Sequence, residues 1–288
     1  MFGIKDLFTT VNLLGGIVAI CLCIDGQPYW AGVSVMLGYL LGDTLDGYVA
    51  RKLGTSNEFG AELDTIADHL SHVVAPSAIV YTVYKDAGLL PSPWNQVLAM
   101  ALASSLIVAV SVRHARNIVA PVKFKGVWSG LPRSVLGFMA IGYCNAQLAP
   151  FAFGGWWLGV VLIPLMAIST LSYWPFPSHH ITRSHYWYVN AVIILTFVLT
   201  IGIWFVKPEF GFDVLFFFMA GYSMSSWMSL APEEREAHRK AVAETKALIA
   251  AQRPAHRRRV PRELHKKHDE EHKRAGAVAD KDPVEVTG

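Results

Sequence analysis

The sequence predicts an all-α protein: a polytopic bundle of membrane helices followed by a charged tail. The chain of 288 residues is 53% hydrophobic and only 16% charged, and long apolar runs fill its first 230 residues. Those residues contain 11 Lys or Arg and 11 Asp or Glu, whereas the last 58 contain 14 and 11. We therefore expect a transmembrane domain over residues 1–230 and a charged, partly disordered cytoplasmic tail over residues 231–288.

Apolar stretches of about 17 to 25 residues are long enough to cross a membrane as helices. The chain contains about eight, at residues 8–24, 30–49, 64–84, 95–114, 133–151, 156–174, 187–206 and 211–229. The first is expected to be a retained helix rather than a cleaved signal peptide. Lys5 is its only N-terminal basic residue, and no clear small-residue cleavage site follows it.

Basic residues in the connecting loops predict the orientation of the helices. With a cytoplasmic N-terminus, Lys85 and Lys207 lie outside. Nine basic residues then lie inside: Lys5, Arg51, Lys52, Arg113, Arg116, Lys123, Lys125, Arg133 and Arg183. Because cytoplasmic loops carry the excess of Lys and Arg, we expect a multi-pass protein of the cell (inner) membrane with both termini in the cytoplasm.

The tail contains two charged stretches, residues 233–251 and 256–274, that lack a continuous apolar face. We expect a charged helix followed by disorder, with Pro254, Pro261 and Pro283 interrupting any longer helix. The tail is either a solvated extension or a segment that binds anionic lipid through a cluster of basic residues. The cluster consists of Arg257, Arg258, Arg259 and Arg262.

Eight residues within 26 positions follow the pattern D-x2-D-G-x2-A-R-x8-G-x3-D-x3-D. They are Asp43, Asp46, Gly47, Ala50, Arg51, Gly60, Asp64 and Asp68. A charged side chain inside a membrane segment costs about 2.5 to 3.5 kcal/mol on insertion scales, so four carboxylates here need a neutralising partner. On helices, the acids of each segment share one face, and two such faces make an oxygen-rich pocket that suits a hard cation such as Mg²⁺. A salt bridge with Arg51 accounts for one acid but not for four.

The other residues of the pattern suit a bound phosphate compound. Gly47 and Gly60 have no side chain and Ala50 has only a methyl group, which leaves room for a flat or bulky ligand. Arg51 can hold phosphate oxygens through its planar guanidinium. With the predicted orientation, all four acids gather near the cytoplasmic face, where soluble nucleotides can reach them.

This spacing, with every position filled, resembles the signature of the CDP-alcohol phosphotransferase family of integral membrane enzymes. The resemblance implies a six-helix core, a homodimer, and transfer from a CDP-linked lipid to an alcohol with release of CMP. It implies that Asp43, Asp46 and Asp64 hold a pair of Mg²⁺ or Mn²⁺ ions with help from Asp68, which is also the general base. It further implies that Arg51 holds the diphosphate and that the small residues leave space for the cytidine. Those small residues are Gly47, Ala50 and Gly60.

Two polar features beside the motif have more than one interpretation. Asn12 matches a position that this family uses near the nucleotide, but an amide on an apolar helix fits a hydrogen bond between helices equally well. His69 and His72 follow the last acid of the motif. We expect both histidines to be hydrogen-bonded structure rather than ligands.

Outside the shared motif, the chain looks most like the phosphatidylserine synthase branch of the family. The resemblance rests on residues 58–68 continuing to Ala75-Pro76, on residues 113–117 followed by Gly130-Leu131-Pro132, and on residues 165–176. The chain departs from the branch at His114, where Leu is usual, and at residues 71–76, where the branch reads Ser-Phe-Gly-Val-Ala-Pro. The resemblance implies CDP-diacylglycerol and L-serine as substrates.

Three arginines give an independent indication of the acceptor. Arg113 and Arg116 lie at i and i+3 near the cytoplasmic end of the fourth apolar segment, and Arg133 opens the fifth. Such a group suits an acceptor that carries an anion, either the carboxylate of serine or the phosphate of a sugar or glycerol phosphate, and it would repel choline. Alternatively, these arginines only set the topology or touch lipid headgroups.

We therefore expect an enzyme of phospholipid biosynthesis that makes phosphatidylserine from CDP-diacylglycerol, or a related CDP-lipid, and L-serine. The same chemistry with glycerol 3-phosphate, inositol or inositol phosphate is the first alternative. A cation transporter that uses the four carboxylates as its ion path is a remote one. The expected partners are the substrates, membrane lipids and a second copy of the chain, with no nucleic acid.

Overall fold

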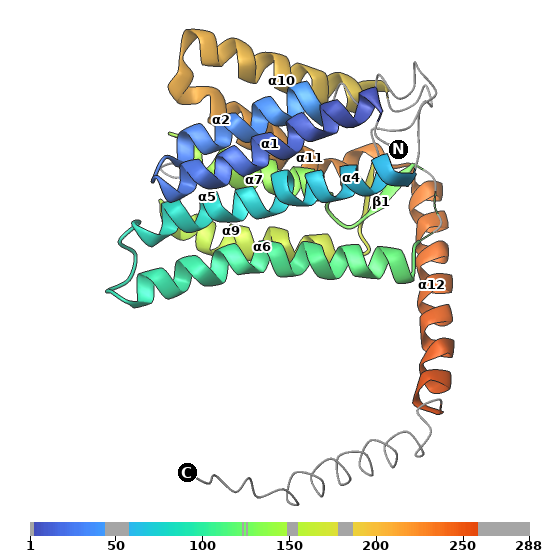
Figure 1. Cartoon of the computed structure of the whole chain (residues 1–288). Helices are drawn as coiled ribbons and strands as arrows, with labels where there is room; N and C mark the ends of the chain where they lie inside the picture. Colours follow the sequence, from blue (N-terminus) through green and yellow to red (C-terminus); the bar gives the residue numbers. More distant parts are fainter. Residues whose placement is uncertain are drawn as a thin grey trace, which may run out of the picture. The chain divides into compact units, whose positions relative to one another are not determined.

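Helices make up nearly all of the regular structure that the computed structural model describes (Figure 1). It describes residues 3–43, 58–122, 124, 126–148, 155–177 and 187–258. The predicted all-α fold class is therefore confirmed. The chain divides into two compact units, Met1–His238 and Arg239–Gly288, and the predicted domain boundary near residue 230 stays a prediction.

The first two helices form an antiparallel pair. α1 (Ile4–Ile24) is joined by a short turn to α2 (Pro28–Gly38), which begins with a proline where no intrahelical N–H is needed. Gly15 and Gly38 approach so closely that a Cβ on either would meet the backbone of the other. The two helices therefore pack backbone against backbone, and α2 continues into the π-helical turn η1 (Tyr39–Asp43).

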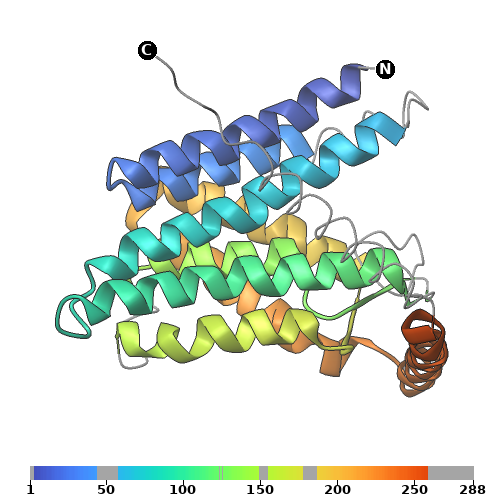
Figure 2. The ribbon, with the colours of Figure 1, turned by 60° about the horizontal axis from the view of Figure 1, so that its bottom comes forward.

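A second helical run is continuous through three elements. α4 (Glu58–His69), the π-helical turn η2 (Leu70–Val74) and α5 (Ala75–Lys85) follow one another without a break. α6 (Trp94–Val119) then returns alongside α5, as Figure 2 shows. Asn95 closes the turn between them by accepting the N–H groups of Leu89 and Leu90 and donating to the carbonyls of Tyr84 and Lys85.

A short ribbon of two strands ties together two connections at one end of the bundle. β1 (Val127–Ser129) pairs antiparallel with β2 (Pro175–Pro177), and α7 (Arg133–Asn145) and α9 (Trp156–Leu171) lie between them in the chain. Figure 1 places β1 at the same end as α4 and the end of α6. The sequence did not predict this ribbon, because three-residue strands are too short for an alternating pattern.

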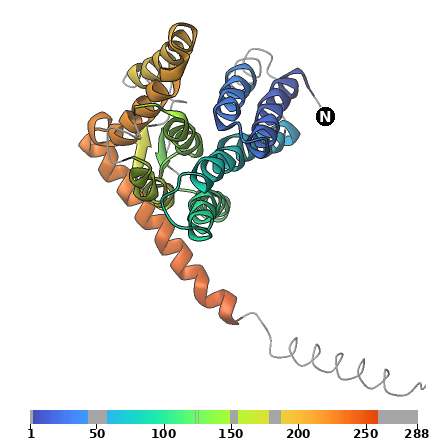
Figure 3. The same ribbon diagram turned by 90° about the vertical axis from the view of Figure 1, so that its left-hand side faces the viewer.

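The last helices of the bundle pack against α7. α10 (Trp187–Val206), the single turn η4 (Pro208–Phe210) and α11 (Gly211–Ser229) follow one another, and α11 contacts both α7 and α10. Figure 3 looks nearly along the helix axes and shows these helices end-on. The expectation that Pro254 interrupts a helix is wrong, since α12 runs over Pro232–Arg258. Pro254 lies near the end of α12, where its missing N–H removes one helical hydrogen bond and only a short stretch of helix follows.

Helices occupy the apolar segments that the sequence predicted, with ends that shift by a few residues. α10 and α11 match their predicted segments, whereas the segment predicted at 30–49 runs into residues 44–57, which lie outside the described part of the chain. By length and composition, two described helices can cross a membrane, Lys5–Ile24 and Trp94–Val119. The count of eight spans therefore stays a prediction.

The apolar surface of the first unit is consistent with lipid contact. Large side chains such as Val161, Ile168 and Phe205 are more than 60% exposed. Large apolar side chains exposed on several helices are consistent with contact with lipid or protein. The apolar helices together with this surface indicate a membrane protein.

Candidate active site

Asp68, in the last turn of α4, is held by side chains from three other elements. Its Oδ2 accepts a hydrogen bond from Nη2 of Arg133 at 2.6 Å, within an ion pair. Its Oδ1 accepts a hydrogen bond from Nδ2 of Asn12 at 3.1 Å and lies 3.5 Å from Nδ1 of His72. The Asp68 side chain nevertheless stays 16% exposed, so a small substrate can reach the carboxylate.

Gly137 on α7 explains why Arg133 reaches Asp68. A Cβ at Gly137 would collide with the backbone carbonyl oxygen of His72, so α7 lies directly against η2. Arg133 precedes Gly137 by four residues, as Asp68 precedes His72, and the two helical runs point in the same direction (Figure 1). Equal offsets on parallel helices bring Arg133 beside Asp68.

A second close approach joins α1 to the end of α2. A Cβ at Gly42 would collide with the backbone and Cβ of Asn12 and with the carbonyl oxygen of Phe8. Gly42 precedes Asp43, the last residue of η1. The π-helical turns η1 and η2 thus carry Asp43 and His72, in keeping with the frequency of such turns at functional sites.

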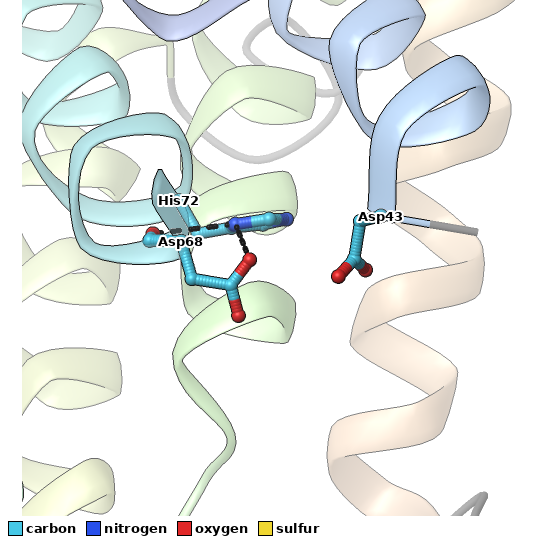
Figure 4. Close-up of side chains that lie close together, drawn as sticks. All are labelled: Asp43, Asp68 and His72. Atoms are coloured by element: carbon cyan, nitrogen blue, oxygen red, sulfur yellow. Dashed lines mark hydrogen bonds and ion pairs between the residues drawn. The ribbon is translucent and has the colours of Figure 1, made fainter. Parts of the chain in front are cut away.

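Asp43, Asp68 and His72 form a group that can hold a metal ion. Their ligand atoms lie within 4.8 Å of one another, and Figure 4 draws the imidazole of His72 between the two carboxylates. A single divalent cation can span ligand atoms this close. The donor set fits such an ion, because carboxylates lie on both sides of the His72 ring, and its buried Nε2 has no hydrogen-bond partner among the described residues.

Asp64, another predicted metal ligand, is not a member of this group. Asp64 lies one turn before Asp68 on α4. Asp46 lies outside the described residues, as do Gly47, Ala50 and Arg51. The roles predicted for these residues stay predictions.

Gly60 lies against α1. A Cβ at this position would meet the side chains of Lys5 and Asp6. Asp6 is fully buried, accepts a hydrogen bond from the N–H of Gly3, and lies 3.8 Å from Nζ of Lys5. The space that the glycine leaves is therefore occupied by these two side chains in the structure, and the predicted room for a cytidine stays a prediction.

Asn12 makes the hydrogen bond between helices that one of its two interpretations expected. The residue is fully buried, and its amide donates to Asp68 from α1 to α4. Its Oδ1 has no hydrogen-bond partner within the described residues. An acceptor is thus still available at this position, and the contact with a nucleotide stays a prediction.

Arg113 and Arg116 contact backbone carbonyls near the ribbon. Nη2 of Arg113 donates to the carbonyl oxygen of Ser129 at 3.5 Å, and Nη1 of Arg116 donates to that of Leu171 at 2.6 Å. The guanidinium of Arg116 also lies 4.4 Å above the ring centre of Tyr173. Nε of Arg113 and Nη2 of Arg116 are buried without a partner among the described residues, so each residue keeps a donor for an anion.

The three predicted acceptor arginines form one basic region but differ in their partners. Arg113 interacts electrostatically with both Arg116 and Arg133. Within the described part of the chain, Arg133 is the member of the trio that pairs with an acid. Arg133 therefore belongs to the surroundings of Asp68 as well as to the basic region.

The ribbon also contacts the beginning of α12. Nε2 of His238 lies 2.9 Å from Oγ of Ser129, and its ring packs edge-on against Phe124. His238 is 1% exposed, and burial lowers the pKa of its imidazole below the ordinary value of 6.5. The neutral imidazole of His238 is therefore favoured at its contact with Ser129, whose carbonyl oxygen also accepts a hydrogen bond from Arg113.

Residues 3–168 match the family model described as CDP-alcohol phosphatidyltransferase, which covers more than half of the chain. The chain belongs to the CDP-alcohol phosphatidyltransferase family. It is therefore an enzyme of the transferase class. Asp43, Asp68, His72 and Arg133 all lie within the matched residues.

The names of curated relatives of this CDP-alcohol phosphatidyltransferase refer to two kinds of acceptor, serine and inositol phosphate. The CDP-diacylglycerol–serine O-phosphatidyltransferase of Methanocaldococcus jannaschii is 31% identical over 180 residues, which cover 61% of this chain and 75% of the relative. The archaetidylserine synthase of Methanothermobacter thermautotrophicus is 36% identical over 85 residues, covering 29% and 36%. The phosphatidylinositol phosphate synthase of Streptomyces avermitilis is 29% identical over 142 residues, covering 47% and 56%. The chain thus spans less than two thirds of the second and third relatives.

His72 is the residue of this phosphatidyltransferase site that the sequence prediction left out. One signal pointed to it, because His72 follows Asp68 by four residues and so lies on the same helix face. His72 lies near Asp43 although the two residues belong to elements that are distant in the sequence, and this proximity depends on how η1 packs against the bundle. No local pattern marks Lys5 and Asp6 as neighbours of Gly60.

Proposed function

We propose that the protein transfers the phosphatidyl group of CDP-diacylglycerol, or of a related CDP-lipid, to the hydroxyl group of L-serine and releases CMP. The observation that carries this proposal is the Asp68 carboxylate, held from three sides within a CDP-alcohol phosphatidyltransferase domain. The relatives from M. jannaschii and M. thermautotrophicus, whose names contain serine, support the acceptor.

In this proposal Asp68 is the general base. In the proposed reaction, the serine oxygen forms a bond to the lipid-bearing phosphorus while the bond from that phosphorus to CMP breaks. Asp68 takes the proton that the serine hydroxyl loses. Arg133 and Asn12 donate to its two oxygens and so fix the orientation of the carboxylate. Each carboxylate oxygen has a further lone pair for the proton.

A cation site adjoins this base. Asp43, Asp46, Asp64 and Asp68 would hold Mg²⁺ or Mn²⁺, as a pair of ions. When bound, such ions neutralise the diphosphate and stabilise charge on the entering and leaving oxygens. The proximity of Asp43 and Asp68 supports this assignment.

The acceptor would be held by the arginines beside the ribbon. Arg113 and Arg116 each keep a buried N–H donor without a partner among the described residues, and Arg133, which pairs with Asp68, is near enough to Arg113 for their charges to repel. A carboxylate accepts such donors in charge-assisted hydrogen bonds. Serine bound there through its carboxylate would present its hydroxyl toward Asp68.

An apolar groove supports a lipid donor. It runs between α1 and α2 with a cavity volume of about 490 Å³, and its lining includes Leu14, Trp30 and Leu41. Leu41 precedes Asp43 by two residues, so the groove ends beside the proposed cation site. We assign it to a hydrocarbon chain of the CDP-lipid. Gly47, Ala50, Gly60 and Arg51 keep their proposed roles toward the cytidine and the diphosphate.

The proposed setting is the cell (inner) membrane. Residues 1–230 would form the transmembrane domain with eight spans, and residues 231–288 the cytoplasmic tail. The excess of basic residues in alternate loops supports a cytoplasmic active site and cytoplasmic termini. A homodimer is part of the same proposal.

The proposal is tested by CMP release from the purified protein with CDP-diacylglycerol and Mg²⁺. L-serine is compared with glycerol 3-phosphate, inositol, inositol phosphate and choline. We expect CMP release that requires both serine and the metal ion. Release with another alcohol alone would contradict the serine acceptor and leave the transfer chemistry standing, whereas the absence of release with every acceptor would contradict the lipid donor.

A phosphorylated alcohol is the second candidate acceptor. The S. avermitilis relative is named as a phosphatidylinositol phosphate synthase, and unpartnered arginine donors suit a phosphate as well as a carboxylate. The same assay separates the two candidates, because serine and inositol phosphate would compete for one set of arginines.

A further inference from the structure

His72 is buried beside the proposed cation site. It lies in η2, is 2% exposed, and packs edge-on against the rings of Tyr39 and Phe138. The aromatic rings hold the imidazole in one place. Figure 4 draws its Nδ1 edge toward Asp68 and its opposite edge toward Asp43.

The surroundings of Nδ1 determine which ring nitrogen carries the proton. Nδ1 lies 2.9 Å from Oγ of Ser71, 3.3 Å from the carbonyl oxygen of Asp68, and 3.5 Å from Oδ1 of the same residue. A carbonyl oxygen and a carboxylate oxygen only accept hydrogen bonds. The Ser71 hydroxyl can donate or accept, so the two Asp68 oxygens favour the neutral tautomer that has its proton on Nδ1 and its lone pair on Nε2.

That lone pair has no hydrogen-bond partner among the described residues. Nε2 of His72 is buried, and a buried polar atom without a partner calls for an explanation. Histidines that bind metal ions typically donate the other ring N–H to a carboxylate or a backbone carbonyl, as His72 can do toward Asp68. The arrangement of the ring is that of a metal ligand.

We propose that Nε2 of His72 and the carboxylate of Asp43 are ligands of one divalent cation, while Asp68 orients the imidazole from its Nδ1 side. One ring nitrogen of His72 and one carboxylate oxygen each of Asp43 and Asp68 lie within 4.8 Å of one another. This inference rests on the proposed metal-dependent transfer and adds a nitrogen ligand to its carboxylates. Imidazole suits transition-metal ions, whereas Mg²⁺ prefers oxygen, so the site favours Mn²⁺ over Mg²⁺ more strongly than carboxylates alone would.

Mn²⁺ binding to the full-length protein in detergent tests this ligand directly. Pulsed electron paramagnetic resonance of bound Mn²⁺ detects the magnetic coupling to a coordinated ¹⁴N nucleus. We expect this coupling in the wild-type protein and its replacement by a ¹⁵N coupling when histidine is labelled with ¹⁵N. The wild-type spectrum does not depend on whether any variant folds.

Variants then assign the nitrogen to one histidine. His72→Asn keeps an amide donor near the place of Nδ1 but removes Nε2, so the coupling should disappear and the Mn²⁺ affinity should fall about tenfold or more. Mg²⁺ affinity should fall less. His114→Asn, at a partly buried histidine of α6, is the matched control and should keep both the coupling and the affinity.

Two results would overturn the inference. One is Mn²⁺ that binds, and loses affinity in Asp43→Asn, but shows no nitrogen coupling in the wild-type protein. The other is the absence of Mn²⁺ binding. CMP release by the same preparation decides separately whether the proposed transfer fails, since transfer with an all-oxygen metal site remains compatible with the first result.

Discussion

Three arginines lie in one basic region of the protein, and the charge of Arg133 is compensated in a different way from the charges of Arg113 and Arg116. Arg133 faces Asp68 at 2.6 Å, and the same carboxylate contacts other side chains. Arg113 and Arg116 donate to backbone carbonyls, and each keeps a buried N–H without a partner among the described residues. Arg133 thus has an acidic partner within the protein. Arg113 and Arg116 leave N–H donors unpaired among the described residues, and we call these two arginines the incomplete set.

This difference separates the machinery of the reaction from the binding of the acceptor. Buried charges are costly unless they are paired. Binding of an anion to the remaining N–H donors of Arg113 and Arg116 would therefore be favourable. The Asp68 cluster is preorganised and has little to gain from a further anion. We therefore expect changes at Asp68 to affect turnover, and changes at Arg116 to affect the acceptor.

Asp68→Asn has the largest expected effect. The amide cannot take the serine proton and carries no charge to balance Arg133, so CMP release should fall about 100-fold or more. The assay is the rate of CMP release at saturating substrates. Asp86→Asn, at an exposed acid beyond the end of α5, is the matched control and should leave the rate unchanged.

Substrate binding distinguishes loss of the base from loss of the fold. Asp68→Asn should still bind the CDP-lipid, because the groove between α1 and α2 does not include this side chain. A variant that retains wild-type turnover would remove Asp68 from the role of base.

Gly137→Ala tests whether the contact between α7 and η2 positions Arg133. The new methyl group would collide with the carbonyl oxygen of His72, so α7 must shift at a cost of about 1 to 3 kcal/mol in stability. We expect a lower midpoint of thermal unfolding and a lower turnover together. Gly221→Ala, where nothing lies within 4 Å of the added Cβ, is the control: turnover should stay unchanged and the midpoint should not fall, because Ala favours a helix over Gly.

Arg116→Gln tests the incomplete set. Removing one charge-assisted donor should raise the KM for serine about tenfold with little change in the KM for the CDP-lipid. Lys85→Gln, at the far end of α5, is the control. An unchanged KM for serine would contradict the acceptor role and favour the alternative in which these arginines set topology.

The fold was easier to predict from the sequence than the site, and particular residues show why. The ends of α10 and α11 follow from hydropathy, which is a local property of the chain. The spacing of Asp43 and Asp68 predicted that carboxylates would meet, and the structure brings these two together. Patterns based on 3.6 residues per turn assume regular helices, and the π-helical turns η1 and η2 break that assumption.

Contacts between distant residues were the main feature that the sequence left open. The role of Arg133 toward the acceptor stays a prediction, whereas its ion pair with Asp68 was not predicted and depends on Gly137, which lets α7 lie against η2. The ribbon of β1 and β2 and the contact of His238 with Ser129 likewise depend on packing. No periodic pattern within either partner encodes such pairs.

The smallest expected effect is a pH dependence at the ribbon, on the side of the incomplete set. Burial lowers the pKa of His238 in the folded protein, so the unfolded chain binds its proton first as the pH falls. The stability contribution of the neutral imidazole is therefore complete above about pH 6.5 and declines as the pH falls below this value. Thermal unfolding between pH 7.5 and 5.5 should show the decline, and His238→Gln, which does not titrate, should weaken it. If the two proteins lose stability equally over this range, the contact of His238 with Ser129 carries no pH dependence, and the ribbon supports Arg113 equally well at either pH.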